Sequence, residues 1–327
     1  MGLNKNYFWR IINYHNNIAL IDTNTNKSLN YYELDSESEK LSEKIKVSKK
    51  GLIFLFTANN SESIITYIAS LKSGNAVLLL DEKLNDEIRN DLIKNYKPDF
   101  IVTSNDLVLD EYTFSSGLHS LKFFKRKNPT EVSIYPELAV LLSTSGTTGS
   151  PKLVRLSYKN IQANAESIAE YLQIDENERP ITTLPINYSY GLSIVNSHLL
   201  KGSAIVLTEK TVFFRDFWNQ FNEHKCTSFA GVPYTYTMLK RIGFDKIEIP
   251  TLKYFTQAGG KLSEEFIKHF NEYALNNDKK FFVMYGQTEA TARITYVPPE
   301  KLGNKIGSIG ISIPGGELKI VNDGVEI

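Results

Sequence analysis

Three short, almost uninterrupted apolar runs dominate the first 140 residues of the chain: GLIFLF (51–56), NAVLLL (75–80) and DFIVT (99–103). Runs of this kind are typical of strands that are buried on both faces of a sheet. Between the first two runs, four apolar residues recur at helical spacing: Ile64, Ile65, Ile68 and Leu71. Ser61 is a candidate N-cap for this helix, and Gly74 marks its C-terminal end. Strand, helix and strand at this pitch predict a parallel α/β sheet.

The same alternation continues in the second half of the chain. Helices are predicted near residues 157–172, 213–224, 234–242 and 263–274. Strands are predicted near residues 181–184, 204–207, 228–230 and 281–284. Beyond Pro298 the pattern changes to GSIGISIPGGELKIVNDGVEI, in which glycines punctuate an alternating sequence. This pattern is typical of antiparallel strands. The fold class is therefore α/β, with two mainly parallel sheets packed with helices.

Composition and charge exclude several classes of function. Lys plus Arg and Asp plus Glu both number 37, so no global field favours nucleic acid or an anionic membrane. Cys226 is the only cysteine, which excludes an intrachain disulfide and a Cys-rich metal site and predicts a small buried residue. No signal segment and no membrane span are visible in the sequence. We therefore expect a cytoplasmic protein.

One stretch, LLSTSGTTGSPKLVRLSYKN (141–160), places an apolar strand against a run rich in Ser, Thr and Gly. Glycines let the backbone approach an anion closely, hydroxyls donate hydrogen bonds, and Lys152 adds a positive charge. The stretch therefore predicts a phosphate-binding loop, with a solvated surface loop as the alternative. It is not the phosphate loop of the nucleotide triphosphatases, because Gly146 and Gly149 are three residues apart and Ser150-Pro151 intervenes before the lysine.

Six segments, in this order, match motifs of one family: LNYYEL (29–34), LKSGNAVLLLD (71–81), TSGTTGSPK (144–152), AGG (258–260), YGQTEAT (285–291) and GSIGISIPGGELKI (307–320). The chain resembles the AMP-forming acid ligases, which include acyl- and aryl-CoA synthetases, firefly luciferase and peptide-synthetase adenylation domains. The resemblance covers almost the whole chain. Leu153 and Tyr158 depart from the family's common Gly and His at the flank of the loop.

The resemblance implies a nucleotide site. The loop residues would hold the β- and γ-phosphates of ATP: Thr144, Ser145, Gly146, Thr147, Thr148, Gly149 and Lys152. The adenine would stack on Tyr285 against Ala258, Gly259 and Gly260, with Gly286 and Gln287 beside it. Thr288 would contact the α-phosphate, and Glu289, with Thr144, would hold Mg²⁺, which suits a hard carboxylate ligand. The implied catalytic residues are Lys152, Thr288 and Glu289.

The resemblance also places the acid pocket at residues 184–202. Its candidate residues are Tyr188, Ser189, Tyr190, Gly191, Val232, Pro233, Tyr234 and Thr291, each of which could instead be an ordinary core residue. Amino-acid-activating members carry an Asp near position 189, and no acidic residue occurs in residues 184–202. Many acyl- and aryl-CoA members carry a His where this chain has Tyr188, so the subgroup stays open. His198 is interpreted as a hydrogen-bonded structural histidine.

The implied reaction joins a carboxylate to the α-phosphorus of ATP with release of pyrophosphate, and then passes the acyl group to a thiol of CoA or of a carrier protein's phosphopantetheine. The implied domains are 1–175 with the loop, 176–292 with the acid and adenine sites, and 293–327 as the start of a small antiparallel β-barrel. The resemblance implies that the family's C-terminal domain is missing from this sequence, so we expect the chain alone to be weakly active or inactive. Two alternatives stay open: an amino-acid adenylation domain that loads a carrier protein, and a non-catalytic nucleotide-binding or acyl-adenylate-binding module.

Overall fold

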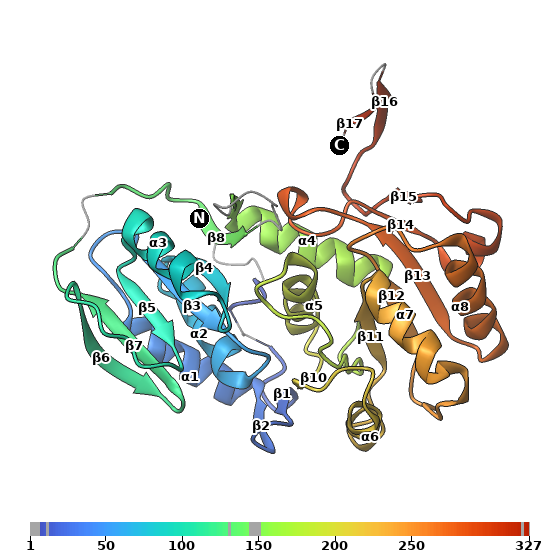
Figure 1. The fold of residues 1–327 in the computed structure, drawn as a ribbon, viewed down its shortest axis with the longest axis horizontal. Coiled ribbons are helices and arrows are strands. Elements are labelled where there is room, and N and C mark those ends of the chain that lie inside the picture. Colours follow the sequence, from blue (N-terminus) through green and yellow to red (C-terminus); the bar gives the residue numbers. More distant parts are fainter. Residues whose placement is uncertain (1–6, 11–12, 130–131, 144–151, 322–323, 327) are drawn as a thin grey trace.

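The computed structural model describes residues 7–10, 13–129, 132–143, 152–321 and 324–326. Two large sheets lie side by side, and the helices α4 (Tyr158–Tyr171) and α5 (Ser189–Leu200) pack together between them (Figure 1). This arrangement confirms the predicted α/β class with helices packed on two sheets, but both sheets are mixed and not mainly parallel: each has a parallel part and an antiparallel part with equal numbers of strand pairs. None of the described helices has the length and apolar character needed to cross a bilayer.

The first sheet has seven strands in the order β6-β7-β5-β3-β4-β8-β9. Its parallel centre is formed by β5 (Phe100–Thr103), β3 (Leu52–Thr57), β4 (Ala76–Asp81) and β8 (Leu138–Ser143). The antiparallel flanks are β6 (Tyr112–Leu118) and β7 (Leu121–Arg126) on one side and β9 (Leu153–Ser157) on the other. The three predicted apolar runs are therefore confirmed as the central strands.

Both faces of this central sheet are covered, which explains why its strands are apolar without alternation. Ile53 and Leu55 pack in the same core as helix α2 (Ser61–Lys72), whereas Phe54 and Phe56 pack with α3 (Asp86–Tyr96). Helix α1 (Tyr31–Lys44) lies against α2.

The predicted N-cap of α2 is wrong by one residue. The side chain of Asn60 accepts a hydrogen bond from the Ser63 amide, as an N-cap does. Ser61 instead donates to the carboxylate of Asp22 through both its amide and its hydroxyl. Asn60 and Ser61 are both residue types that cap helices, but Ser61 is engaged by Asp22, which is distant in sequence, and Asn60 is the cap.

The second sheet has five strands in the order β11-β12-β13-β14-β15. Three are parallel: β11 (Ser228–Gly231), β12 (Tyr254–Gln257) and β13 (Lys280–Tyr285). Two are antiparallel: β14 (Thr295–Val297) and β15 (Ile311–Ser312). Three longer helices accompany this sheet: α6 (Arg215–Glu223), α7 (Pro233–Ile242) and α8 (Glu264–Asn276). Three 3₁₀ turns complete this half: η1 (Phe244–Lys246), η2 (Thr288–Ala290) and η3 (Pro299–Asn304).

The strand predicted at 181–184 is wrong. Only Pro180 and Ile181 form isolated bridges, to Ser228 and Val206 respectively. The segment therefore links two different sheets instead of extending one of them. The strand predicted near 204–207 is confirmed as β10 (Ile205–Leu207).

A third, small sheet has the order β10-β1-β2, with β1 (Ile18–Asp22) parallel to β10 and antiparallel to β2 (Lys27–Asn30). It joins the start of the chain to the segment after α5, across the domain boundary predicted at 175, which stays a prediction. The last strands, β16 (Lys319–Val321) and β17 (Gly324–Glu326), form a hairpin that projects from the body (Figure 1). The antiparallel prediction for this region is confirmed, but the described residues form no closed barrel.

Candidate active site

The three parallel strands of the second sheet end at one common edge. Their registers place the ends of β11 and β12 side by side, and β13 continues beyond them to Tyr285. The segments that follow these strands are 232–233, 258–260 and 286–289, all of which the sequence predicted as site residues. Ligands of open α/β sheets bind outside the carboxyl ends of the strands, so the edge is a suitable place for a binding site.

The turn after β12 brings the predicted adenine and acid residues together. Gly259 has a φ of +77°, and a Cβ there would lie 2.4 Å from the hydroxyl of Tyr188 and 3.0 Å from Cγ1 of Val232. Only glycine fits this combination of backbone angle and neighbours. The turn is fixed by the side chain of Gln257, which donates to the carbonyl of Gly260 at 2.8 Å. Ala258 is buried at the start of the same turn.

The YGQTEAT segment folds tightly back on itself after β13. A Cβ on Gly286 would lie 1.7 Å from the carbonyl oxygen of Ala292, so this glycine permits a close backbone approach. Thr291 has a φ of +72°, an unusual angle for a β-branched residue. Tyr285 is the last residue of β13 and keeps 40% of its surface exposed. Gln287 is exposed next to it.

One hydrogen bond joins the acid pocket to the predicted α-phosphate contact. The hydroxyls of Ser189, at the start of α5, and Thr288, at the start of η2, lie 3.2 Å apart. Glu289 follows on the exposed side of η2. Its carboxylate is the kind of hard oxygen ligand with which Mg²⁺ binds when phosphates supply its other ligands. The described residues contain no cluster of three or more His, Cys, Asp or Glu side chains that could hold a metal.

The predicted phosphate loop, residues 144–151, lies outside the described residues, and its roles stay predictions. Its two flanks are described: β8 ends at Ser143, and Lys152 is exposed immediately before β9. Strand β9 packs against η2, which carries Thr288 and Glu289. The C-terminal flank of the loop therefore lies beside the predicted catalytic residues.

The remaining pocket residues have different surroundings. Gly191 is buried, and a Cβ there would lie 2.2 Å from the carbonyl oxygen of Pro185, so close packing alone accounts for this glycine. Pro233 begins α7 and contacts the Gly260 position, whereas Tyr234 is 69% exposed. Thr291 lines a cleft of about 380 Å³ between α4 and residues 312–318.

Tyr190 lies deeper than its neighbours and is held by two contacts. Its hydroxyl lies 2.7 Å from that of Thr256, and the guanidinium of Arg293 lies over its ring at 4.1 Å. Burial raises the pKa of Tyr190 to about 12, so the phenol is neutral at physiological pH. This tyrosine therefore links the pocket to a buried cation.

Arg293 is the residue that sequence analysis missed. It is 2% exposed and lies between η2 and β14, directly after the recognised motif. The sequence contains a signal for this residue: the largely apolar run ARITYV (292–297) predicts a buried strand, and an arginine is rarely buried without a partner. Its burial, however, depends on α4 and α5, which the local sequence does not reveal.

The interpretation of His198 as a hydrogen-bonded structural residue is confirmed. Its Nδ1 donates to the carbonyl of Ile194 at 2.8 Å, and Nε2 accepts from the Tyr254 hydroxyl at 3.3 Å. Burial lowers the pKa of His198 to about 4, so the ring is neutral. Cys226 is fully buried, as predicted.

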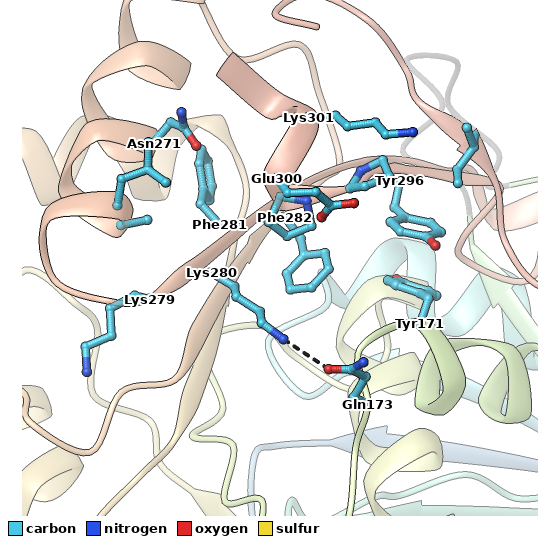
Figure 2. A pocket seen from close by; sticks show the side chains of 15 residues that line it. Tyr171, Gln173, Asn271, Lys279, Lys280, Phe281, Phe282, Tyr296, Glu300 and Lys301 are labelled. Atoms are coloured by element: carbon cyan, nitrogen blue, oxygen red, sulfur yellow. Dashed lines mark hydrogen bonds between the residues drawn. The ribbon is translucent and has the colours of Figure 1, made fainter. Parts of the chain in front are cut away.

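A separate groove of about 500 Å³ lies at the opposite end of β13 (Figure 2). Tyr171 stacks on Tyr296 along one side with centroids 4.4 Å apart, and Lys280 bonds to Gln173 at the base. No residue predicted for the nucleotide or acid site lines this groove. The candidate site is therefore the opposite edge of the sheet.

Comparison with known families agrees with this geometry. The model of the AMP-binding enzyme family matches residues 8–326. The chain therefore belongs to the AMP-binding enzyme family.

Among curated proteins, the chain is similar to 2-succinylbenzoate--CoA ligase of Bacillus subtilis, with 25% identity over 91% of the chain and 62% of that protein. It is also similar to the enzyme of the same name from Lactococcus lactis, with 26% identity over 89% of the chain and 63% of that protein. The D-alanine--D-alanyl carrier protein ligase of Staphylococcus epidermidis is 24% identical over 94% of the chain and 64% of that protein. The chain thus spans somewhat less than two thirds of the length of these relatives.

Solved structures share the fold. The o-succinylbenzoate CoA synthetase of Bacillus subtilis superposes with a TM-score of 0.80 over 98% of the chain and 67% of that structure, at 23% identity. The N-terminal domain of FACL13 from Mycobacterium tuberculosis has a TM-score of 0.78 over 99% of the chain and 86% of that structure, at 15% identity. VinN in complex with L-aspartate has a TM-score of 0.77 over 94% of the chain and 81% of that structure, at 23% identity.

Proposed function

We propose that the chain binds ATP and a carboxylic acid side by side and activates the acid as an acyl-adenylate. In the whole protein, the acyl group would then pass to a thiol of CoA or of a phosphopantetheine carrier. Family membership supports the adenylate chemistry, and the relatives named CoA ligase support the thiol step. The relative that serves a carrier protein keeps the second acceptor open.

One observation carries this proposal: the residues predicted for the nucleotide and those predicted for the acid meet at a single edge. Tyr188 lies against Gly259, and Ser189 bonds to Thr288. An acid in contact with the start of α5 would therefore have its carboxylate beside the α-phosphate contact. Alignment of two reactants in this way is a major source of rate enhancement.

The proposed step begins with the substrate carboxylate, whose oxygen attacks the α-phosphorus. The new P–O bond forms as the bond between the α-phosphorus and the pyrophosphate oxygen breaks, and pyrophosphate leaves with its electrons. Lys152 would neutralise charge on the leaving phosphates, and Thr288 would donate to the α-phosphate. Mg²⁺ bound through Glu289 and the phosphates would supply the remaining neutralisation.

The nature of the acid is narrowed by what the pocket lacks. Ser189 stands where an amino-acid-activating site places an Asp, and its hydroxyl is engaged with Thr288. The buried Arg293 nearby would repel a substrate ammonium. A free α-amino acid is therefore disfavoured as the substrate.

The test is acid-dependent exchange of labelled pyrophosphate into ATP by the whole protein, measured over fatty, aryl, hydroxy, amino and dicarboxylic acids. We expect exchange with one class, reduced at least tenfold in Glu289→Gln and in Lys152→Ala. Glu272→Gln and Lys268→Ala, both on the exposed surface of α8, are the matched controls and should exchange normally. Exchange that persists in Glu289→Gln, or folded protein that binds ATP without any acid-dependent exchange, would contradict the proposal. The second outcome would favour a nucleotide-binding module.

A further inference from the structure

Arg293 is a buried cation whose contacts among the described residues are all neutral. Its Nη1 lies 3.3 Å from the Tyr171 hydroxyl and 2.6 Å from the sulfur of Met284, and its Nη2 lies 3.3 Å from the Ser193 hydroxyl. The Tyr190 ring covers one face of the guanidinium. Nε is buried and has no hydrogen-bond partner.

No carboxylate within the described part of the chain forms an ion pair with Arg293. Arginine is rarely buried to this extent without an acidic partner, because desolvation of the charge is costly. Two other shielded cations have such a partner: Arg126 pairs with Glu111 at 3.1 Å and Lys72 with Asp35 at 2.6 Å. The missing partner of Arg293 is therefore an anion that the described residues do not supply.

The position of Arg293 connects it to the candidate site. It contacts Tyr190 and Ser193 on the first turns of α5, the helix whose Ser189 bonds to Thr288. Tyr188 contacts both Tyr190, whose ring Arg293 covers, and the Gly259 turn. Its ring packs edge-on to Tyr190, and its hydroxyl approaches Gly259. A ligand that extends from Thr288 past Tyr188 would therefore meet the guanidinium.

The surroundings of Arg293 suit a compact polar group. Arg293 borders an interior space of about 10 Å³, room for about one water, and polar side chains of Ser197, His198, Tyr254 and Thr256 line part of it. Arg293 also lines the cleft of about 380 Å³ that Thr291 lines. In a binding mode of this kind, the carboxylate reaches the guanidinium past Tyr188, which rotates away from Gly259. Tyr188 is half-buried and packs at the edge of a core cluster.

We propose that the acid activated by this chain is a dicarboxylic acid, whose distal carboxylate pairs with Arg293 while its other carboxylate is adenylated. This inference rests on the proposed function. A bidentate ion pair in a desolvated pocket is strong and directional, and Arg is the side chain that makes it. The ion pair would also neutralise the otherwise uncompensated charge of Arg293, so ligand binding would stabilise the folded protein.

The experiment is a calorimetric titration of the chain with acyl sulfamoyl-adenosines, which are stable analogues of acyl-adenylates. The probes are made from succinic, glutaric, adipic and phthalic acids and from the monoamide of each acid, so that every diacid has an uncharged match. The proteins are the wild type, Arg293→Met and Arg293→Lys. Circular dichroism, together with retained binding of the monoamide probes, shows that each variant is folded.

We expect the wild type to bind at least one diacid probe ten or more times more tightly than its monoamide. Arg293→Met should lose this preference and bind the diacid and monoamide probes equally, whereas Arg293→Lys should keep part of it. Equal binding of every matched pair by the wild type, or a preference that survives in Arg293→Met, would overturn the inference and leave the proposed function intact. Binding of no probe at all would overturn the proposed function and this inference with it.

Discussion

Two shielded cations, Lys72 and Arg293, lie in different parts of the molecule and differ in whether a carboxylate neutralises them. Lys72, at the end of α2, is 6% exposed and reaches two carboxylates of α1, Asp35 at 2.6 Å and Glu39 at 3.5 Å. Arg293, beside α5, is 2% exposed, and among the residues that the structure describes its side chain contacts hydroxyls, a thioether and a ring but no carboxylate.

We interpret this difference as one of role: the charge of Lys72 stabilises the fold, whereas the charge of Arg293 binds a ligand. The charge of Lys72, on α2, is neutralised by two carboxylates of α1, and these ion pairs hold the two helices together. A charge left uncompensated inside a pocket destabilises the empty protein, a cost that binding can reverse.

The largest effect concerns acid pH. His198 has a pKa of about 4 in the fold, chiefly because of burial, with Arg293 adding repulsion, against a reference value of 6.5. Between these pH values the unfolded chain therefore binds more protons than the folded protein. The contribution of neutral His198 to the stability of the fold is complete above pH 6.5 and is lost as the pH falls to about 4. The loss should reach about 3 kcal/mol of unfolding free energy.

Urea denaturation at a series of pH values measures this loss as the difference between the wild type and His198→Asn, which cannot titrate. Removal of the nearby positive charge in Arg293→Met should make the loss smaller, whereas Lys72→Met should leave it unchanged. An identical pH dependence in the wild type and His198→Asn would contradict the prediction.

The second prediction concerns the paired cation. Lys72→Met removes the partner of Asp35 and Glu39, and we expect the unfolding free energy to fall by about 2 kcal/mol. The fall is below the range for fully buried pairs because both carboxylates can rehydrate. Urea denaturation at pH 7 measures it, and a change of less than about 0.5 kcal/mol, typical of a surface pair, would remove the structural half of the comparison.

The third prediction compares two glycines, one in each region. Gly74, next to the Lys72 helix, and Gly259, at the site, have φ values of +79° and +77°. A Cβ at Gly74 has no atom within 4 Å, whereas one at Gly259 meets Tyr188 and Val232.

Both alanine variants should therefore suffer similar backbone strain, but only Gly259→Ala should displace Tyr188. We expect Gly259→Ala to weaken binding of an acyl sulfamoyl-adenosine at least tenfold, about 1.4 kcal/mol, and Gly74→Ala to leave it unchanged. Fluorescence or calorimetric titration measures both. Equal affinities for the two variants would show that the Tyr188–Gly259 contact does not shape the site.

The smallest effect is predicted for the unpaired cation itself. Arg293→Met exchanges an uncompensated charge for an apolar side chain of similar length, so we expect the unfolding free energy of the empty protein to stay within about 1 kcal/mol of the wild type or to rise. Chemical denaturation without ligand measures this change. A loss as large as that of Lys72→Met would mean that Arg293 is a structural residue and that the two cations do not differ.

Sequence analysis predicted the parts of the fold that local patterns encode. The apolar runs that became β3 and β4 are short and buried on both faces. The AGG and YGQTEAT motifs lie at the ends of β12 and β13, where a site is expected. The hairpin β6–β7 was missed because β6 is largely exposed and carries no apolar run. The pairing of β1 with β10 joins segments from opposite sides of the first sheet's sequence, which no local pattern encodes.

The candidate site was predicted by motif and not by geometry. The turn at Gly259 and the residues Tyr188 and Ser189 were named from the sequence, but their contacts arise only when α5 packs against the second sheet. Arg293 was missed for the same physical reason, because its burial is produced by α4, α5 and β13 together.

The central claim, that nucleotide and acid occupy one edge of the second sheet, is tested most directly by a crystal structure of the chain with a dicarboxylic acyl sulfamoyl-adenosine. The account predicts the adenosine against Tyr285 and the 258–260 turn, the sulfamoyl group beside Thr288, and the acyl chain running past a rotated Tyr188 towards Arg293. An analogue bound elsewhere, such as in the groove at the far end of β13, would contradict it.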